Sequence, residues 1–322
     1  MSTEAVVCQP HTGFDLGVRP VFPRVWDNTM RSDFVTCPHS AFLRFFHGCV
    51  PANTNVHLHA GGAFAKALEA TRIAFYGKGM HKDDAMAEGL KALYLAYGDF
   101  DSGDSVKSVD RMAGALEYYF AVWPLATDHA KPLMLPNHGP AVEFNFVLPI
   151  PEVAHPETGE PILYSGRFDM LAEYADSIYV EDDKTTTQLG ASWPNQWKLR
   201  SQFTGYCWGA RQFGYKVAGA IVRGVSILKR DYGNAEAIVY RPDWMVDRWY
   251  AQLVRDLHRA VDCWRDNFWD QNFADGCSSY GSCPYVRLCE SPTPQTWMNS
   301  PHYKFKLWDP TDPYAGEEGA VK

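Results

Sequence analysis

The residues best suited to catalysis or metal binding are acids and a lysine in two predicted neighbouring strands. Asp169 interrupts an otherwise apolar strand, and Asp182 and Lys184 lie at the end of the next one. Side chains two residues apart in a strand project from the same face, so Asp182 and Lys184 should share a face while Asp183 points away. If the two strands pair, the carboxylates of Asp169 and Asp182 converge. The pattern predicts a site with two carboxylates and one ammonium group.

Such a site suits the hydrolysis of a phosphodiester. Two carboxylates can bind Mg²⁺ or Mn²⁺ through oxygen, while water and a substrate phosphate complete the coordination. A lysine can orient the attacking water and offset the charge that develops in the transition state. A bare Asp-x-Lys is more often a solvated surface turn. The glycine three residues before Asp169 and the Thr185-Thr186 pair after Lys184 favour the functional interpretation.

A second polar group follows in a helix predicted over 196–213. Lys198, Gln202 and Tyr206 are spaced by four residues, which places them on one helical face. An amide and a phenol can hydrogen-bond phosphate, sugar or a metal-bound carboxylate, and the lysine adds a positive charge. The same spacing also fits an exposed polar stripe.

The late cysteines form a third group. Cys277, Cys283 and Cys289 bring three thiols within thirteen residues, and Cys37, which precedes Pro38, is the candidate for a fourth ligand. Structural zinc sites usually use ligand pairs two to four residues apart, so the spacing favours an iron–sulfur cluster over zinc. Free buried thiols are the alternative, and this interpretation suits Cys49, Cys207 and Cys263. Cys8, in the lead-in, is expected to be unpaired.

The elements that must position these groups can be read from periodicity. Helices are expected over 61–75, 82–97 and 107–122, and a helix should begin at Pro38. A meander of three strands is expected over 142–148, 161–174 and 177–182, with Pro149 ending the first strand. After the helix at 196–213, the pattern predicts strands over 217–228 and 235–240 and a long helix to about residue 267. Residues 1–30 read as an irregular lead-in, and the region after the long helix as loop-like.

Composition excludes several classes of protein. The chain has 322 residues, of which 46% are hydrophobic and 21% charged, so it should fold rather than remain disordered. Its 30 basic and 38 acidic residues give a net charge of −8, which excludes an overall positive field that would attract nucleic acid. A local basic groove is still compatible with this composition. No apolar run approaches the roughly 20 residues of a membrane helix, and the N-terminus does not read as a secretory signal. A cytoplasmic protein without a membrane partner is expected.

Taken in order, these motifs resemble the RecB-like branch of the PD-(D/E)XK nuclease superfamily, which includes CRISPR-associated and phage or bacterial exonucleases with an iron–sulfur cluster. The resemblance covers 37–289. It rests on Cys37-Pro38, a glycine-rich helix start at Gly61-Gly62, G-x-x-D ending at Asp169, D-x-K-T at 182–185, Q-x-x-x-Y at 202–206 and the three late cysteines. It implies an α/β fold with a restriction-endonuclease-like core, in which helices flank a mixed central sheet in α-β-β-β-α-β order.

The resemblance also implies roles and a domain plan. Asp169 and Asp182 would bind Mg²⁺ or Mn²⁺, Lys184 would be the catalytic lysine, and Gln202 and Tyr206 would lie in the DNA-binding part of the site. Cys37, Cys277, Cys283 and Cys289 would hold a 4Fe-4S cluster. One nuclease domain would span 31–290, with a helical insertion at about 78–135, a core at about 141–240 and the cysteine-rich region at 270–290. A C-terminal tail would follow at 291–322.

The implied activity is a metal-dependent deoxyribonuclease, an exonuclease that processes DNA ends or single strands in recombination, replication or repair. Helicases, annealing proteins and CRISPR integration proteins are the partner classes of such relatives. Two departures bear on this expectation. Ala65 stands where the family often has a histidine, and His57, His59 or Glu69 could substitute, with Glu69 preferred because it lies one helical turn beyond Ala65. The gap between Cys277 and Cys283 is five residues where many relatives have two. The alternatives are a catalytically inactive DNA-binding or scaffold protein with the same fold and cluster, and a zinc-stapled protein of unrelated function.

Overall fold

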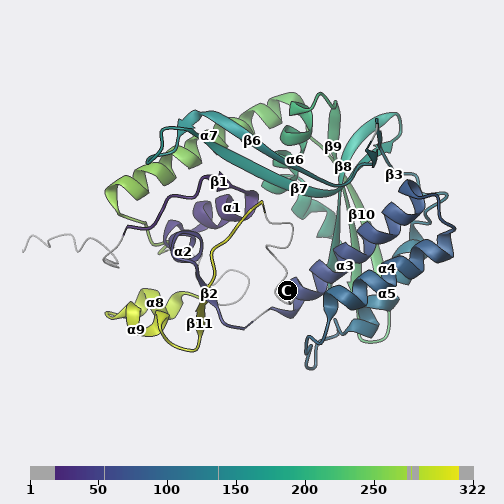
Figure 1. Cartoon of the computed structure of the whole chain (residues 1–322), viewed down its shortest axis with the longest axis horizontal. Helices are drawn as coiled ribbons and strands as arrows, with labels where there is room; N and C mark the ends of the chain where they lie inside the picture. Colours follow the sequence, from purple (N-terminus) through teal and green to yellow (C-terminus); the bar gives the residue numbers. More distant parts are fainter. Residues whose placement is uncertain (1–18, 54, 137, 274–276, 278–282, 312–322) are drawn as a thin grey trace, which may run out of the picture.

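The chain forms a mixed β-sheet flanked by helices (Figure 1). The computed structural model describes residues 19–311 apart from 54, 137, 274–276 and 278–282. The main sheet has the order β1-β7-β8-β9-β10, and two further strands, β3 and β6, also pair with β7. The bounds are β1 Val25–Trp26, β3 Lys131–Pro132, β6 Val142–Ala154, β7 Pro161–Tyr174, β8 Ser177–Thr186, β9 Val217–Ile227 and β10 Tyr232–Tyr240. The expected α/β class with a mixed central sheet is confirmed.

The predicted meander is present as the antiparallel strands β6, β7 and β8. β9 then pairs in parallel with β8, and β10 pairs antiparallel with β9. The prediction that Pro149 ends the first strand is wrong, because β6 continues to Ala154. Within the described residues β6 pairs only with β7, so a proline without an N–H can sit on its open edge without removing a ladder bond.

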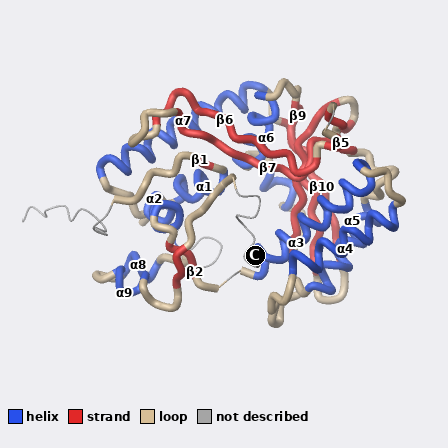
Figure 2. The backbone as a smooth tube through the Cα atoms, in the orientation of Figure 1, coloured by secondary structure: helices blue, strands red, loops and turns tan. Residues whose placement is uncertain are grey.

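The two faces of the sheet are covered by different helices, drawn in blue around the red strands in Figure 2. Alternation along β9 sends Val225 and Ile227 into the apolar cluster of α3, α4 and α5, and Val222 into the cluster that includes α6 and α7. The helices are α3 Val56–Arg72, α4 Lys82–Tyr97, α5 Val109–Val122, α6 Ser201–Gln212 and α7 Asp243–Asp266. The predicted site residues of β8 therefore face one helical layer or the other, depending on whether their residue number is even or odd.

The helix predictions differ from the structure mainly at helix starts. α4 spans 82–97 as predicted, but α3 begins at Val56, where the side chain of Asn55 accepts a hydrogen bond from the backbone N–H of His57. α6 begins at Ser201 and not at residue 196. A short 3₁₀ helix, η3 (Trp193–Trp197), buries its two tryptophans just before it, and extended backbone at Arg200 separates the two helices.

The lead-in is more structured than predicted. β1 lies in it and pairs in parallel with β7, and α1 (Asn28–Thr36) starts within it, capped by the side chain of Asp27. The helix predicted at Pro38 is α2 (Pro38–Ala41), which runs into a π-helical turn, η1 (Phe42–Phe46). α3 ends in a similar turn, η2 (Ile73–Gly77).

The C-terminal region also contains regular structure where loops were predicted. α8 (Val286–Glu290) and α9 (Pro294–Met298) precede β11 (Tyr303–Phe305), which pairs antiparallel with β2 (Cys49–Pro51). These elements gather with α1 and α2 at one end of the molecule, while α3, α4 and α5 form the other end (Figure 1). A small hairpin joins β4 (Met134–Leu135) to β5 (Gly139–Pro140). Among the described helices, none combines the length and the apolar character needed to cross a membrane.

Candidate active site

Asp169, Asp182 and Lys184 meet where β7 and β8 separate. The two strands pair from Tyr174 and Ser177 to Met170 and Glu181, and the next residue on each strand is Asp169 or Asp182. Beyond this point β7 stays beside β6, whereas β8 stays beside β9. The divergence leaves room between the strands for the acidic side chains.

Direct contacts tie the three groups together. The Asp169 carboxylate accepts a 2.6 Å hydrogen bond from the backbone N–H of Asp183, and Nζ of Lys184 contacts the carboxylate of Asp182. Asp183 points to the opposite face, where it pairs with Arg72. The common face of Asp182 and Lys184, with Asp183 turned away, is as the alternation predicted.

The electrostatics of this group favour a bound cation. Burial raises the pKa of Asp169 well above its usual value, and the nearby charges of Asp182 and Asp183 raise it further. Burial also raises the pKa of Asp182, although Lys184 opposes the shift. Burial alone would lower the pKa of Lys184, but the charges of Asp182 and Asp169 raise it above its ordinary value, so the amine stays protonated. One ammonium leaves negative charge in excess, which a divalent ion with oxygen ligands would balance.

The structure adds a carboxylate that sequence reasoning missed. Glu143 on β6 has a φ of 51°, a left-handed conformation that is rare for a residue other than glycine, and its side chain is only 14% exposed. Its Oε2 lies 3.2 Å from Nε of Arg167. Burial raises the pKa of Glu143 to about 7, with Arg167 opposing the shift and Glu69 adding to it. The charge of Glu143 in turn raises the pKa of Asp169, so Glu143 belongs to the same site. An acid within an apolar strand was the available signal, as for Asp169.

Of the three residues expected to substitute for a histidine at the position of Ala65, Glu69 has a charge that acts on an acid of this site. It sits on α3, pairs with Nζ of Lys66 at 3.0 Å and acts on Glu143. His59 is buried elsewhere, with Nε2 2.9 Å from the carbonyl oxygen of Tyr97 and its ring stacked on Phe100. His57 is exposed near the start of α3.

Gln202 and Tyr206 lie beside the acids on α6, but Lys198 does not lie on that helix. The Gln202 amide donates a 2.8 Å hydrogen bond to the Tyr206 hydroxyl. Burial raises the pKa of Tyr206 well above its usual range, and the Asp182 charge contributes. Lys198 is exposed in the turn before α6, so the prediction of one helical face with three polar residues is wrong for it.

The glycine of the G-x-x-D motif has a packing role. A Cβ on Gly166 would lie 2.6 Å from Cζ of Phe146 and 3.3 Å from Cδ1 of Tyr206. The first distance is shorter than real Cβ contacts allow, so a side chain here would push Phe146 away. The absence of a side chain at Gly166 therefore leaves room for the Phe146 ring and lets Tyr206 pack close to β7.

A buried network of charged groups supports the other face of β8. Arg72 of α3 bonds Glu181 at 2.7 Å and Asp183 at 2.8 Å, and the Tyr119 hydroxyl of α5 donates to Asp183 at 2.7 Å. The network extends to Arg223 of β9, which lies 3.5 Å from Glu181 and makes two short bonds to the carboxylate of Asp128 and one to Glu236. The network fixes β8 directly behind Asp182 and Lys184.

Lys107 holds the end of β8. It is 2% exposed, and its Nζ donates to the carbonyl oxygen of Thr185 at 3.1 Å and to the hydroxyl at 2.9 Å. Burial lowers the pKa of this lysine to about 8. The contact fixes the residue that follows Lys184.

The four predicted cluster cysteines come from the N-terminal and C-terminal parts of the described chain and lie near enough for their charges to act on one another. Cys37 caps α2, Cys289 lies on α8, and the Cys283 backbone N–H donates to the Cys277 carbonyl at 2.9 Å. Burial, with smaller contributions from the charges of Cys283, Cys37 and Cys277, raises the pKa of Cys289 to about 12. Within the described ranges no three His, Cys, Asp or Glu side chains are already arranged as a metal-ligand group. Four thiols from α2, α8 and the loop before α8 nevertheless supply the soft donors of a zinc or iron–sulfur site.

The remaining cysteines follow their predictions where the structure describes them. Cys49, Cys207 and Cys263 are buried free thiols, and Cys8 lies outside the described residues.

Comparisons with known proteins add little to this picture. No protein-family model matches the chain, and no curated protein matches it. A solved structure described as the "crystal structure of SSO0001" is 15% identical, covering 62% of this chain and 74% of that chain, with a TM-score of 0.26. A score this low carries no argument about fold or function.

Proposed function

We propose that the protein is a metal-dependent deoxyribonuclease with a PD-(D/E)XK core of the RecB-like type. The supporting observation is the meeting of Asp169, Asp182 and Lys184, with buried carboxylates and a protonated lysine, at the point where β7 and β8 diverge. Structural ion pairs also perturb carboxylates. Here, however, the acids outnumber the lysine and lie beside Gln202 and Tyr206, which can hydrogen-bond a substrate.

Asp169 and Asp182 would bind Mg²⁺ or Mn²⁺, with Glu69 and Glu143 available as further oxygen donors. Such an ion polarises the scissile phosphate and lowers the pKa of a bound water. The chain's own residues do the rest. Lys184 orients the attacking water and offsets negative charge on the phosphate oxygens. The Tyr206 hydroxyl and the Gln202 amide bind the phosphate or sugar next to the scissile bond, and Arg72 keeps Asp183, and with it β8, in place.

The cysteine group fits a metal centre that joins the two ends of the chain. Thiols crowded enough to raise one another's pKa are stabilised as thiolates when a metal is bound. Their spacing supports a 4Fe-4S cluster, with zinc as the competing occupant. The cluster would have a structural role, because its ligands lie on elements other than those that carry Asp169 and Asp182.

The proposed substrate is DNA, at ends or in single strands, in recombination, replication or repair. Helicases, annealing proteins or CRISPR integration proteins are the proposed partner classes.

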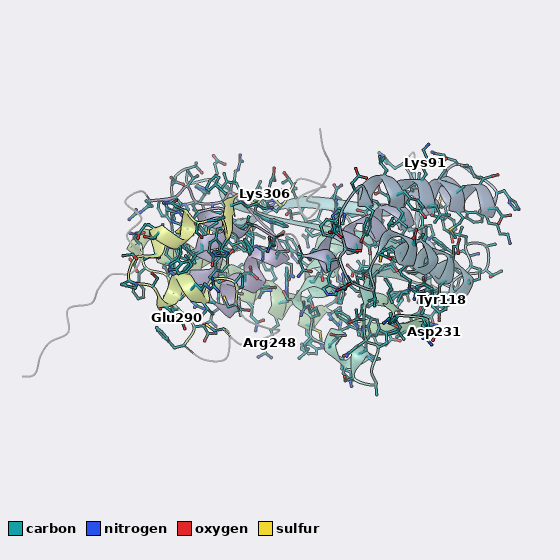
Figure 3. The ribbon with its side chains drawn as sticks, turned by 90° about the horizontal axis from the view of Figure 1, so that it is seen from below. Lys91, Tyr118, Asp231, Arg248, Glu290 and Lys306 are labelled. Atoms are coloured by element: carbon teal, nitrogen blue, oxygen red, sulfur yellow. The ribbon has the colours of Figure 1, made fainter. Side chains whose placement is uncertain are left out.

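The function can be tested with end-labelled linear DNA, single- and double-stranded, incubated with Mg²⁺ or Mn²⁺. Wild type prepared without oxygen should cleave it and Lys184→Ala should not, with a loss of at least about 10²-fold expected for a group that stabilises the transition state. Lys91→Ala is the matched control, because Lys91 is exposed on α4 in the helical lobe (Figure 3). Omitting the metal should abolish cleavage by wild type.

Three results would contradict the proposal. Equal cleavage by Lys184→Ala would remove the lysine from the mechanism, and cleavage without a divalent ion would remove the metal. Binding of DNA without cleavage under any metal would instead support the inactive DNA-binding protein, with Ala65 as the expected cause.

A further inference from the structure

A cavity of about 330 Å³ lies along an open edge of β7 beside the candidate active site. β1 pairs with this edge at Leu163 and Tyr164, and β8 pairs with it from Met170 onward. β1 and β8 pair with the same edge of β7, because β6 pairs along the opposite edge. In the part of the chain that the structure describes, no strand pairs with this edge in between, and Ser165, Gly166 and Arg167 of this stretch line the cavity.

The cavity adjoins the proposed chemistry through α6. Gln202 and Tyr206 line one wall. Tyr206 also lies close enough to Asp182 and Asp169 for their charges to raise its pKa. The start of α1 and residues 308–311 line the opposite side. If a DNA strand bound with one phosphate at Asp169 and Asp182, the neighbouring nucleotide of that strand would therefore lie at this cavity.

The lining combines uncharged hydrogen-bonding groups with apolar surface. Asn28, Asn145, Gln202 and Ser165 contribute amides and a hydroxyl, and Trp308 and Pro310 contribute apolar atoms.

The two charged residues of the lining are already engaged. Asp27 accepts hydrogen bonds from the backbone N–H of Met30 and from Nε1 of Trp308. Arg167 pairs with Glu143. The cavity therefore offers a phosphate little positive charge, whereas side-chain amides are the groups that hydrogen-bond the edges of nucleobases.

We propose that this cavity holds one unpaired nucleobase of the DNA strand, next to the phosphodiester that is cleaved. The proposal rests on the proposed nuclease function and names its substrate as a single strand or a frayed end. The volume is at the small end of the roughly 300–1,000 Å³ range of ligand pockets and is large enough for one nucleobase. A base inside a duplex must leave its stack before it can enter, so double-stranded DNA is bound less well.

The test is an abasic scan on the Lys184→Ala protein, in Ca²⁺, with binding followed by fluorescence anisotropy. Labelled single-stranded oligonucleotides carry one abasic residue at successive positions from the end. Removal of the base that occupies the cavity should weaken binding by roughly five- to a hundredfold, the range for loss of one base contact. Other positions should change affinity much less.

Two variants in the same background locate the effect. Asn145→Trp places an indole in the cavity mouth from an exposed position of β6, and it should weaken binding and remove the dependence on abasic position. Ala154→Trp, an equally bulky change at an exposed position of β6 outside the cavity lining, should leave both unchanged.

Each other outcome counts against the proposal. A flat abasic profile on DNA that still binds overturns the base pocket and leaves the nuclease intact. Dependence on a terminal phosphate instead of a base assigns the cavity to phosphate, and a profile unchanged in Asn145→Trp places the base elsewhere. Absence of both DNA binding and cleavage in wild type removes the proposed function together with this inference.

Discussion

Glu143 carries an energetic cost in both its side chain and its backbone. Its carboxylate is buried near Glu69 and Asp169, and its left-handed φ costs on the order of 1 kcal/mol in a non-glycine residue. Strain of this kind persists where the surroundings over-determine a conformation, and it is concentrated at functional sites. In Glu143 the strained backbone places a third acid where its charge acts on Asp169.

The acid–base behaviour of Glu143 gives a prediction about stability. Its pKa is about 7 in the fold against an ordinary value of 4.5, so between these pH values the unfolded chain releases a proton that the folded chain retains. Wild type should therefore lose stability relative to Glu143→Gln as pH rises from 4.5 to 7, by about 2 kcal/mol. Urea unfolding at pH 5 and pH 8 in EDTA measures the difference. Glu117→Gln, an exposed change on α5, should show none of it, and a parallel pH dependence of wild type and Glu143→Gln would refute the assignment.

At the scale of elements, the site depends on charges that join α3, α5, β8, β9 and β10. Arg223 is fully buried among Glu181, Asp128 and Glu236, and Arg72 bridges Glu181 to Asp183. Buried ion pairs add little net stability compared with apolar packing, but removing one partner leaves the other charge stranded. The network therefore acts chiefly as a constraint on where β8 lies.

Arg223→Met tests that constraint. The change removes the main counter-charge of the buried Asp128 carboxylate and leaves Glu181 to share Arg72 with Asp183, so the free energy of unfolding should fall by roughly 3–5 kcal/mol. Arg248→Met, at an exposed site on α7 (Figure 3), should stay within about 0.5 kcal/mol of wild type. The double variant Arg223→Met/Glu181→Gln should recover part of the loss, because one stranded charge is gone. A double variant no more stable than the single one would show that Glu181 is not the stranded partner.

The elements also show how far sequence reasoning reaches. Local periodicity and turns predicted α4 at its observed bounds and the order of β6, β7 and β8, and parity along β8 placed Asp182 beside Lys184. The partners across the fold could not be predicted, since Arg72 and Asp183 lie 111 residues apart and nothing local pairs them. The prediction for Lys198 was wrong because the four-residue spacing assumes one continuous helix. In the structure η3 ends at Trp197 and α6 begins only at Ser201, so Lys198 lies between the two helices.

At the scale of the whole molecule, the first and last described segments of the chain form one lobe. β2 pairs with β11, and the Tyr285 hydroxyl donates to the carbonyl oxygen of Cys49 at 2.7 Å. β1 and Trp308 bring the same lobe to the cavity beside β7. Under the proposed function, a chain with a net charge of −8 would hold DNA by local contacts and not by a global field, so the position of this lobe would matter for binding.

The cysteine group should hold the lobe together, and removing one ligand tests this. Protein prepared without oxygen should contain iron and acid-labile sulfide in equal amounts, and Cys289→Ser should lose most of both because its thiolate is a proposed ligand. Cys263→Ser, a buried free thiol on α7, should keep them. Because metal binding is linked to folding, Cys289→Ser should also unfold at a lower temperature than Cys263→Ser, and chelation should lower the unfolding temperature of wild type toward that of Cys289→Ser. Zinc without sulfide would contradict the iron–sulfur assignment but would keep a structural metal site at these cysteines. A metal content that is the same in both variants would remove Cys289 from the site, and the lobe would then depend on the pairing of β2 with β11 and on its apolar core.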